Sequence, residues 1–138
     1  MIIVDTGVLL AYFIATDPDH VTAREFLETT REPLTTTPLV IAEVDYFVLE
    51  RFGPDHEARV IEHLMEGPLA LAEFGERELI ACSRLLGRYQ DLELGLTDAS
   101  VMVAAESLGT RKIATFDERD FRAVTTEAGL AFDLLPQG

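Results

Sequence analysis

Residues 1–10 read MIIVDTGVLL, and this stretch decides the fold. Ile2, Ile3 and Val4 are a β-branched run, which is typical of a short strand buried on both faces. The run ends at Asp5, so a carboxylate lies where a buried strand gives way to a helix. In open α/β sheets ligands bind outside the carboxyl ends of the strands, although Asp is also a common helix cap. This stretch alone supports the ligand-binding and the capping interpretation of Asp5 equally.

The remainder of the chain alternates short apolar runs with helical patterns, which predicts an α/β fold whose mostly parallel sheet has helices on both faces. We expect strands at residues 1–4, 34–36, 69–72, 112–115 and 131–135. We expect helices at residues 7–14, 20–28, 38–52, 54–66, 76–87, 97–108 and 118–124. Thr6 and Gly7 are predicted to form a tight turn after the first strand, and Thr37 and Thr97 to cap later helices.

The composition is that of one soluble globular domain over residues 1–138, with 48% hydrophobic and 26% charged residues. Its single cysteine, Cys82, forms no internal disulfide, which fits a reducing cytoplasm. No apolar run is as long as a membrane span, and no basic segment precedes a long apolar stretch. We therefore expect a cytoplasmic protein with no signal peptide and no membrane partner.

The net charge of −14 argues against a protein that binds nucleic acid along a broad basic face. It favours a basic protein partner, a metal site that concentrates carboxylates, or simple solubility. The histidines show no metal-ligand spacing, and Gly-rich phosphate-binding loops are absent. The acids are therefore the candidate ligands.

Two acids lie in helical segments that are otherwise apolar. Asp98 is in the first turn of a helix that is apolar nearly all round, where the helix dipole favours a carboxylate. Glu43 has apolar neighbours three and four residues away, so an ionised side chain there needs an ion-pair partner or a metal. Asp45 has equally apolar neighbours, and the pattern alone does not separate it from Glu43.

Asp117 follows the fourth predicted strand as Asp5 follows the first, and Thr115 places a hydroxyl two residues before it. Asp120 is predicted to be solvated, as part of the exposed turn DERD, and Asp91 to be a turn residue. We therefore expect a group of acids to converge at one edge of the sheet: Asp5, Glu43, Asp98 and Asp117.

Carboxylates that lie so close cannot all remain ionised without a cation, since like charges raise each other's pKa. Hard oxygen ligands suit Mg²⁺, for which Mn²⁺ can substitute. Such an ion polarises a phosphodiester, generates a hydroxide nucleophile and stabilises the leaving oxygen. The acids therefore favour a metal site for phosphodiester chemistry.

The acids occur in four motifs: IVDTGVLLA with Asp5, IAE with Glu43, YQDLELGLTDAS with Asp98, and ATFDERDF with Thr115 and Asp117. In order and spacing these motifs resemble those of PIN domain ribonucleases, and in particular the VapC toxins of type II toxin–antitoxin (VapBC) systems. The resemblance covers residues 2–121. It implies a single PIN domain over residues 1–138, a three-layer α/β/α sandwich around a mostly parallel sheet of about five strands.

The resemblance also implies an Mg²⁺-dependent endoribonuclease. Asp5 and Asp98 would be the main metal ligands, while Glu43 and Asp117 would complete the acidic pocket and orient the attacking water. The match selects Glu43 over Asp45. Two hydroxyl groups would support these ligands, those of Thr6 and Thr115.

By the same resemblance, a cognate VapB-type antitoxin would hold the protein inactive, with a basic side chain in the acidic pocket. The protein would form a homodimer, and its substrate would be a folded RNA such as tRNA or rRNA, recognised by shape. A non-catalytic, acidic PIN-like module that binds a basic protein is the alternative. Six cations are candidates for phosphate contacts: Arg84, Arg88, Arg111, Lys112, Arg119 and Arg122.

Overall fold

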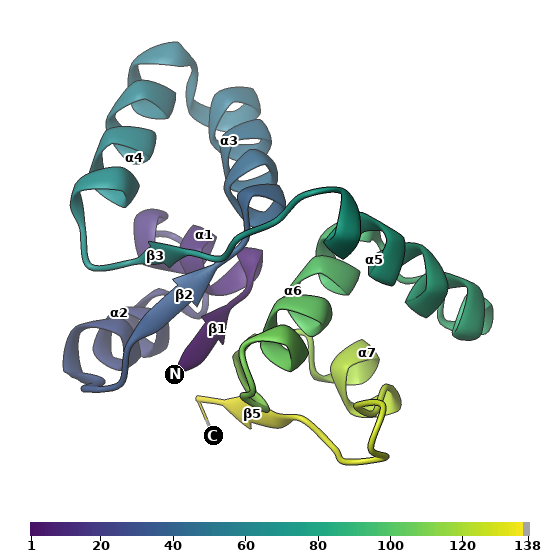
Figure 1. Cartoon of the computed structure of the whole chain (residues 1–138). Coiled ribbons are helices and arrows are strands. Elements are labelled where there is room, and N and C mark those ends of the chain that lie inside the picture. The colour runs from purple at the N-terminus through teal and green to yellow at the C-terminus, as the bar shows by residue number, and fades with distance from the viewer. Residues whose placement is uncertain (137–138) are drawn as a thin grey trace.

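Strand β1 (Ile2–Val4), the β-branched run near the amino end, is fully buried at the centre of a parallel sheet. The structure, a computed structural model, describes residues 1–136 of the chain. The other strands are β2 (Leu34–Thr36), β3 (Ala70–Leu71), β4 (Lys112–Ala114) and β5 (Asp133–Leu135). Within the described range the sheet has five strands in the order β3-β2-β1-β4-β5, and every pairing is parallel (Figure 1).

Helices flank this sheet, as Figure 1 shows. They are α1 (Thr6–Phe13), α2 (His20–Thr29), α3 (Pro38–Phe52), α4 (Pro54–Glu66), α5 (Glu76–Arg88), the 3₁₀ helix η1 (Gln90–Leu92), α6 (Leu96–Ser107) and α7 (Glu118–Ala123). The predicted α/β fold is therefore confirmed, and the predicted strand boundaries agree within two residues. No helix in residues 1–136 is long and apolar enough to cross a membrane.

The strand order reverses at β1, which gives the sheet a defined ligand-binding edge. β2 and β3 lie on one side of β1, and β4 and β5, which come later in the chain, lie on its other side. In open α/β sheets the crevice outside the carboxyl ends of the strands, at such a reversal, is where ligands bind. Asp5 follows β1 directly and Asp117 follows β4 within three residues, so both acids lie at this point.

Helix α1 begins one residue earlier than we predicted. It begins at Thr6, directly after Asp5, so the expected tight turn at Thr6 and Gly7 is wrong. The Asp5 side chain accepts a hydrogen bond from the Thr6 backbone N–H, which allows the strand to pass into the helix without an intervening turn.

Helix α6 is the buried helix of the fold. Every residue from 99 to 105 is buried, and the helix packs on β1, β4, α3 and α5. Thr97 is not its cap, contrary to the sequence prediction. The helix begins at Leu96 because its first backbone hydrogen bond runs from the Ala99 amide to the carbonyl of Gly95, at 3.1 Å. Thr97 is thereby placed inside the first turn.

A chain of buried hydroxyl groups joins α3 to α6. Thr37 caps α3 as predicted, since its Oγ1 accepts a hydrogen bond from the Val40 N–H at 3.2 Å. The same hydroxyl lies 2.8 Å from Oγ of Ser100 on α6. Ser100 donates its only hydroxyl proton to the Thr97 carbonyl, at 2.6 Å, so Thr37 must be the donor to Ser100. These bonds fix the start of α3 against the first turn of α6.

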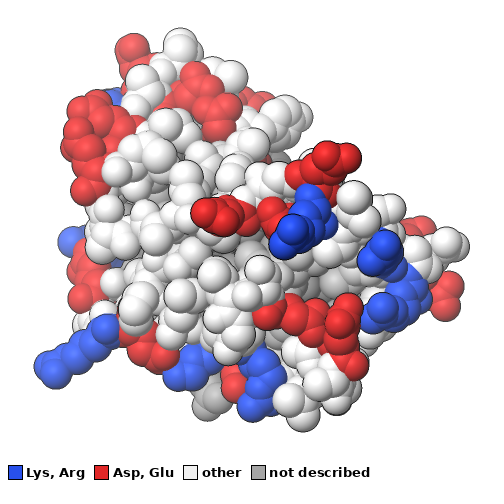
Figure 2. Space-filling model, viewed as in Figure 1, with Lys and Arg blue, Asp and Glu red and all other residues white. Residues whose placement is uncertain are grey.

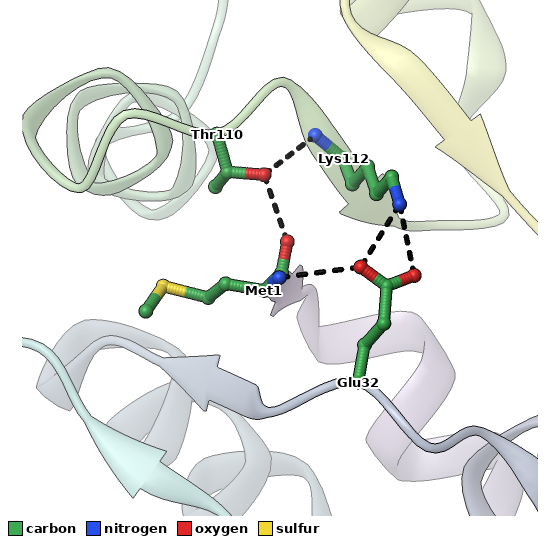
Figure 3. A network of polar contacts seen from close by, with 4 residues as sticks. All are labelled: Met1, Glu32, Thr110 and Lys112. Carbon is green, nitrogen blue, oxygen red and sulfur yellow. Dashed lines mark hydrogen bonds and ion pairs between the residues drawn. The ribbon is translucent and has the colours of Figure 1, made fainter.

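A second polar network closes the opposite, amino-terminal edge of the sheet (Figure 3). The Met1 amino group lies 3.2 Å from Oε1 of Glu32, and Lys112 Nζ lies 2.9 Å from both carboxylate oxygens of Glu32. Thr110 Oγ1 donates to the Met1 carbonyl at 2.8 Å. The hydrogen bonds from Lys112 and from the amino terminus hold the pKa of Glu32 below its ordinary value. This network ties the starts of β1, β2 and β4 together, and it pairs Lys112 within the protein.

We predict that Thr37→Val destabilises the protein, because the α3 cap and the bond to Ser100 are both lost. The free energy of unfolding should fall by about 1–2 kcal/mol, measured by urea denaturation. Thr22→Val, which makes the same change at an exposed position of α2, should leave the unfolding midpoint nearly unchanged. Equal midpoints for the two variants would contradict the role given to the hydroxyl chain.

Candidate metal centre

Asp5 uses its two carboxylate oxygens for two different contacts. Oδ1 accepts from the Thr6 backbone N–H at 2.8 Å, and Oδ2 accepts from the Thr115 hydroxyl at 2.8 Å. The side chain is buried, with 5% of its surface exposed, yet it lines a pocket at the carboxyl edge of the sheet. Asp5 therefore caps α1 and faces the pocket at the same time, so the two interpretations of this residue are compatible.

The pocket has a volume of about 320 Å³ and brings together acids from four separate parts of the chain. Asp5 follows β1 and Asp117 follows β4, while Glu43 lies on α3 and Asp98 lies on α6. Thr6 and Phe47 also line the pocket. The structure thus places all four of the acids singled out from the sequence around one space.

The structure also separates Glu43 from Asp45, which the sequence pattern did not. Asp45 does not line this pocket; its carboxyl group lies close to that of Glu57 on α4. The side-chain interaction with Asp45 is the main reason why the pKa of Glu57 is raised, and burial and the charge of Asp45 raise it further. Asp91 lies exposed in η1, away from the lining of the pocket.

Asp120 lies beside the site, contrary to the prediction that it is solvated in an exposed turn. Carboxylate oxygens of Asp98, Asp117 and Asp120 all lie within 4.8 Å of one another, a spacing that suits a metal ion. Asp120 is half-buried in the first turn of α7, not solvated in a turn, because the neighbouring Phe121 is fully buried and holds α7 against the core. The spacing of three residues between Asp117 and Asp120, next to an apolar anchor, is the signal that could have revealed it.

Burial and the charges of neighbouring acids raise the pKa of two pocket residues, Asp98 and Asp5. The pKa of Asp98 rises to about 7, first because the group is buried and then because of the charges of Asp5, Asp117, Glu43 and Asp120. Burial also raises the pKa of Asp5, although the hydrogen bonds from Thr115 and Thr6 oppose that rise. Near neutral pH the site therefore gains stability from a cation that lets all of its carboxylates ionise.

The hydroxyl groups around the pocket complete a donor set of hard oxygen atoms. Thr115 Oγ1 donates to Asp5 and accepts from the Asp117 amide at 3.0 Å, so it links the two acids. Thr6 Oγ1 is buried with no hydrogen-bond partner among the described residues, although Thr6 lines the pocket. An unsatisfied buried hydroxyl beside several carboxylates fits a site that takes a hydrated divalent cation.

Comparison with known proteins agrees with the motifs. A profile of the PIN domain matches residues 2–127. Ribonuclease VapC26 of Mycobacterium tuberculosis is 39% identical over 134 residues, which are 97% of this chain and 99% of that protein.

Solved structures share the fold. VapC20 of Mycobacterium tuberculosis, described as a sarcin-ricin loop cleaving toxin, superposes with a TM-score of 0.83 at 19% identity, over 92% of this chain and 98% of that one. A chain of the DNA-bound VapBC complex of Salmonella typhimurium superposes with a TM-score of 0.68 at 18% identity, over 96% of each chain. Together with the full-length match to a VapC ribonuclease, these findings show that the chain belongs to the PIN domain family and, within it, to the VapC group.

Proposed function

We propose that this protein is the toxin of a type II toxin–antitoxin system and an Mg²⁺-dependent endoribonuclease. The observation that carries the proposal is the convergence of Asp5, Glu43, Asp98 and Asp117 on one pocket, in a chain that belongs to the VapC group. A non-catalytic acidic module would gain nothing from burying acids whose pKa values are raised by the burial. The catalytic function is therefore favoured over that alternative.

In this mechanism Asp5 and Asp98 are the main ligands of the metal, and Glu43 and Asp117 complete its surroundings. The bound Mg²⁺ would supply Lewis-acid stabilisation of the charge that develops on the phosphate oxygens. Thr115 holds Oδ2 of Asp5 in place, so this carboxylate needs little rearrangement when the substrate arrives. We assign the exposed Asp117 carboxylate, together with Glu43, to orienting the attacking water.

The free hydroxyl of Thr6 and the carboxylate of Asp120 are further groups that the substrate or its water would meet. The Thr6 hydroxyl can donate or accept a hydrogen bond at the pocket wall, which suits a water molecule or a phosphate oxygen. Asp120 adds a carboxylate beside Asp98 and Asp117. We assign both to positioning of the water and the metal.

The partners follow from the same assignment. A VapB-type antitoxin with a basic segment complements a chain of net charge −14, and RNA is the substrate. An exposed apolar stripe on α3 supports a homodimer; it consists of Tyr46, Leu49 and Phe52. We propose that residues 1–138 act as one PIN domain in the cytoplasm, where RNA is available and a lone Cys82 stays reduced.

Substitution of the two main ligands tests the function. Antitoxin-free protein should cleave RNA in Mg²⁺ or Mn²⁺, and EDTA should abolish cleavage. The double variant Asp5→Asn, Asp98→Asn should lose about 100-fold or more in kcat/KM, because groups that hold transition-state charge are removed.

Asp45→Asn is the matched control, since Asp45 lies on the same helix as Glu43 but outside the pocket. It should cleave RNA at the wild-type rate. Cleavage that persists in the double variant would overturn the assignment of the site. Binding of a basic partner without any RNA cleavage by the wild-type protein would support the non-catalytic alternative.

The raised pKa of Asp98 predicts that this metal ligand lowers the stability of the metal-free protein. Its ordinary value is 3.8, and in the folded protein the pKa is about 7. The pKa of Asp98 is higher in the folded than in the unfolded protein, so the folded state binds this proton more tightly. The stability that this proton contributes is fully present below the unfolded pKa of 3.8, and it is lost as the pH rises through the folded pKa of about 7. Without metal, Asp98→Asn should therefore raise the Tm at pH values above about 7, and the gain should vanish in acid.

Thermal melts in EDTA across this pH range measure the effect. Asp91→Asn removes an exposed acid and should leave the Tm unchanged at every pH. A Tm of Asp98→Asn below that of the wild-type protein in mildly alkaline buffer would show that burial of this acid does not strain the fold.

A further inference from the structure

Only some of the Lys and Arg side chains of this protein form ion pairs within the described structure. The sequence has 11 Lys and Arg residues against 25 Asp and Glu residues. Ion pairs within the protein engage Lys112, Arg122 and Arg24. Among the described residues, no carboxylate lies within ion-pair distance of Arg77, Arg84 or Arg88, all of which are exposed on α5. Two of these, Arg84 and Arg88, are among the six cations that the sequence singled out.

These arginines line one groove, which we call the α5–α6 groove. It is a hollow of about 270 Å³ between α5 and the C-terminal half of α6, and its lining includes Arg77, Arg84, Arg88, Val103 and Glu106. Spacings of seven and four residues place all three arginines on the same side of α5. In Figure 2 basic side chains lie at the right of the molecule, over the region where Figure 1 places α5, and further basic side chains lie along the lower edge.

The acids of the groove are largely engaged elsewhere. Glu78 Oε1 accepts a hydrogen bond from the Gly75 backbone N–H at 2.8 Å, and Glu106 Oε1 accepts one from the Glu127 backbone N–H at 2.6 Å. The third acid of the lining is the exposed side chain of Glu127. Two carboxylates are thus held by backbone amides, while the guanidinium groups have N–H donors to offer to a ligand. The groove's three arginines and three acids balance in formal charge, but no ion pair among the described residues joins them, so the guanidinium N–H groups remain available to a ligand.

We propose that the α5–α6 groove binds the sugar–phosphate backbone of the RNA substrate beside the cleavage site, an inference that rests on the proposed ribonuclease function. Guanidinium groups bind phosphate through two parallel hydrogen bonds, which suits a row of arginines to an RNA backbone. The acidic pocket repels phosphates, so the affinity for RNA has to come from cations outside it. Three arginines without an ion pair among the described residues lie along this one groove.

Helix α6 sets the distance between the groove and the pocket. Asp98 lies in its first turn at the pocket, and Glu106 lies near its other end at the groove. Eight residues of helix span about 12 Å, since each residue rises 1.5 Å. That span equals about four stacked nucleotides at 3.4 Å each. This axial separation is short enough for one RNA strand to reach from the pocket to the groove.

The test compares two triple variants that lose the same charge. In one, Arg77, Arg84 and Arg88 are changed to Gln; in the other, the exposed Arg31, Arg51 and Arg59 are changed to Gln. Binding of a fluorescent single-stranded RNA of about 16 nucleotides is followed by anisotropy in EDTA, which prevents cleavage. A third variant changes the three groove arginines to Lys. It keeps their charge, and so it distinguishes lost phosphate contacts from a lost fold.

The groove variant should bind the RNA at least about tenfold more weakly, and its plot of log affinity against log salt should be shallower by about 2, as expected for three lost phosphate contacts. The control variant should keep the wild-type slope; the Lys variant should also keep that slope, because its charge is unchanged, and should recover only part of the affinity, because Lys makes no bidentate contact. With Mg²⁺ and total tRNA, the groove variant should show a raised KM and an unchanged kcat, because only uniform substrate binding is lost.

The outcomes separate this inference from the proposed function. If wild-type protein with Mg²⁺ cleaves no RNA, the proposed function fails. If it cleaves RNA but the groove variant has the KM and the salt slope of the control variant, only the groove inference is overturned. It is also overturned if the groove variant keeps its RNA affinity but loses affinity for a VapB-type antitoxin, which would make the groove a protein-binding surface.

Discussion

Repulsion among the acids at the carboxyl edge of the sheet is the constraint on which the rest of this structure depends. Carboxylates that are brought together and partly buried oppose folding, since each loses hydration and faces like charges. The raised pKa of Asp98 and of Asp5 records that opposition. The free energy that holds the acids together must come from the apolar core and from hydrogen bonds, including those that Thr6 and Thr115 donate to Asp5.

The fold meets this constraint with rigid supports for each acid. Asp5 directly follows the fully buried central strand, and Asp98 lies in the first turn of α6, where the next seven residues are all buried. The hydroxyl chain from Thr37 through Ser100 sets α3, and with it Glu43, against α6. Asp117 is linked to Asp5 through a single hydroxyl, that of Thr115. The geometry of the pocket therefore depends on buried contacts that solvent and salt affect little.

Patterns within short segments predicted much of this arrangement, because local chemistry determines it. The β-branched run of β1, the Thr-Pro start of α3 and the apolar character of α6 each depend on a few neighbouring residues. Features set by distant contacts were not predictable in this way. Gly95 replaces Thr97 at the start of α6 although glycine carries no capping side chain, and Asp120 reaches the site because the burial of Phe121 orients α7. Glu43 and Asp45 have similar sequence neighbours, but Glu43 faces the pocket whereas Asp45 faces Glu57 on α4.

The position of β1 in the sheet has a consequence for the order in which the molecule is made. β1 is synthesised first, but one of its two neighbours is β4, and Ile3 pairs beside Ile113 in the register of these strands. A chain that grows at roughly 5–20 residues per second exposes this edge of β1 for several seconds before β4 leaves the ribosome. Asp5 and Asp117 meet only when that pairing forms. A growing chain that has not yet paired β4 with β1 therefore has no assembled acidic pocket, and the ribosome carries no finished nuclease before that pairing forms.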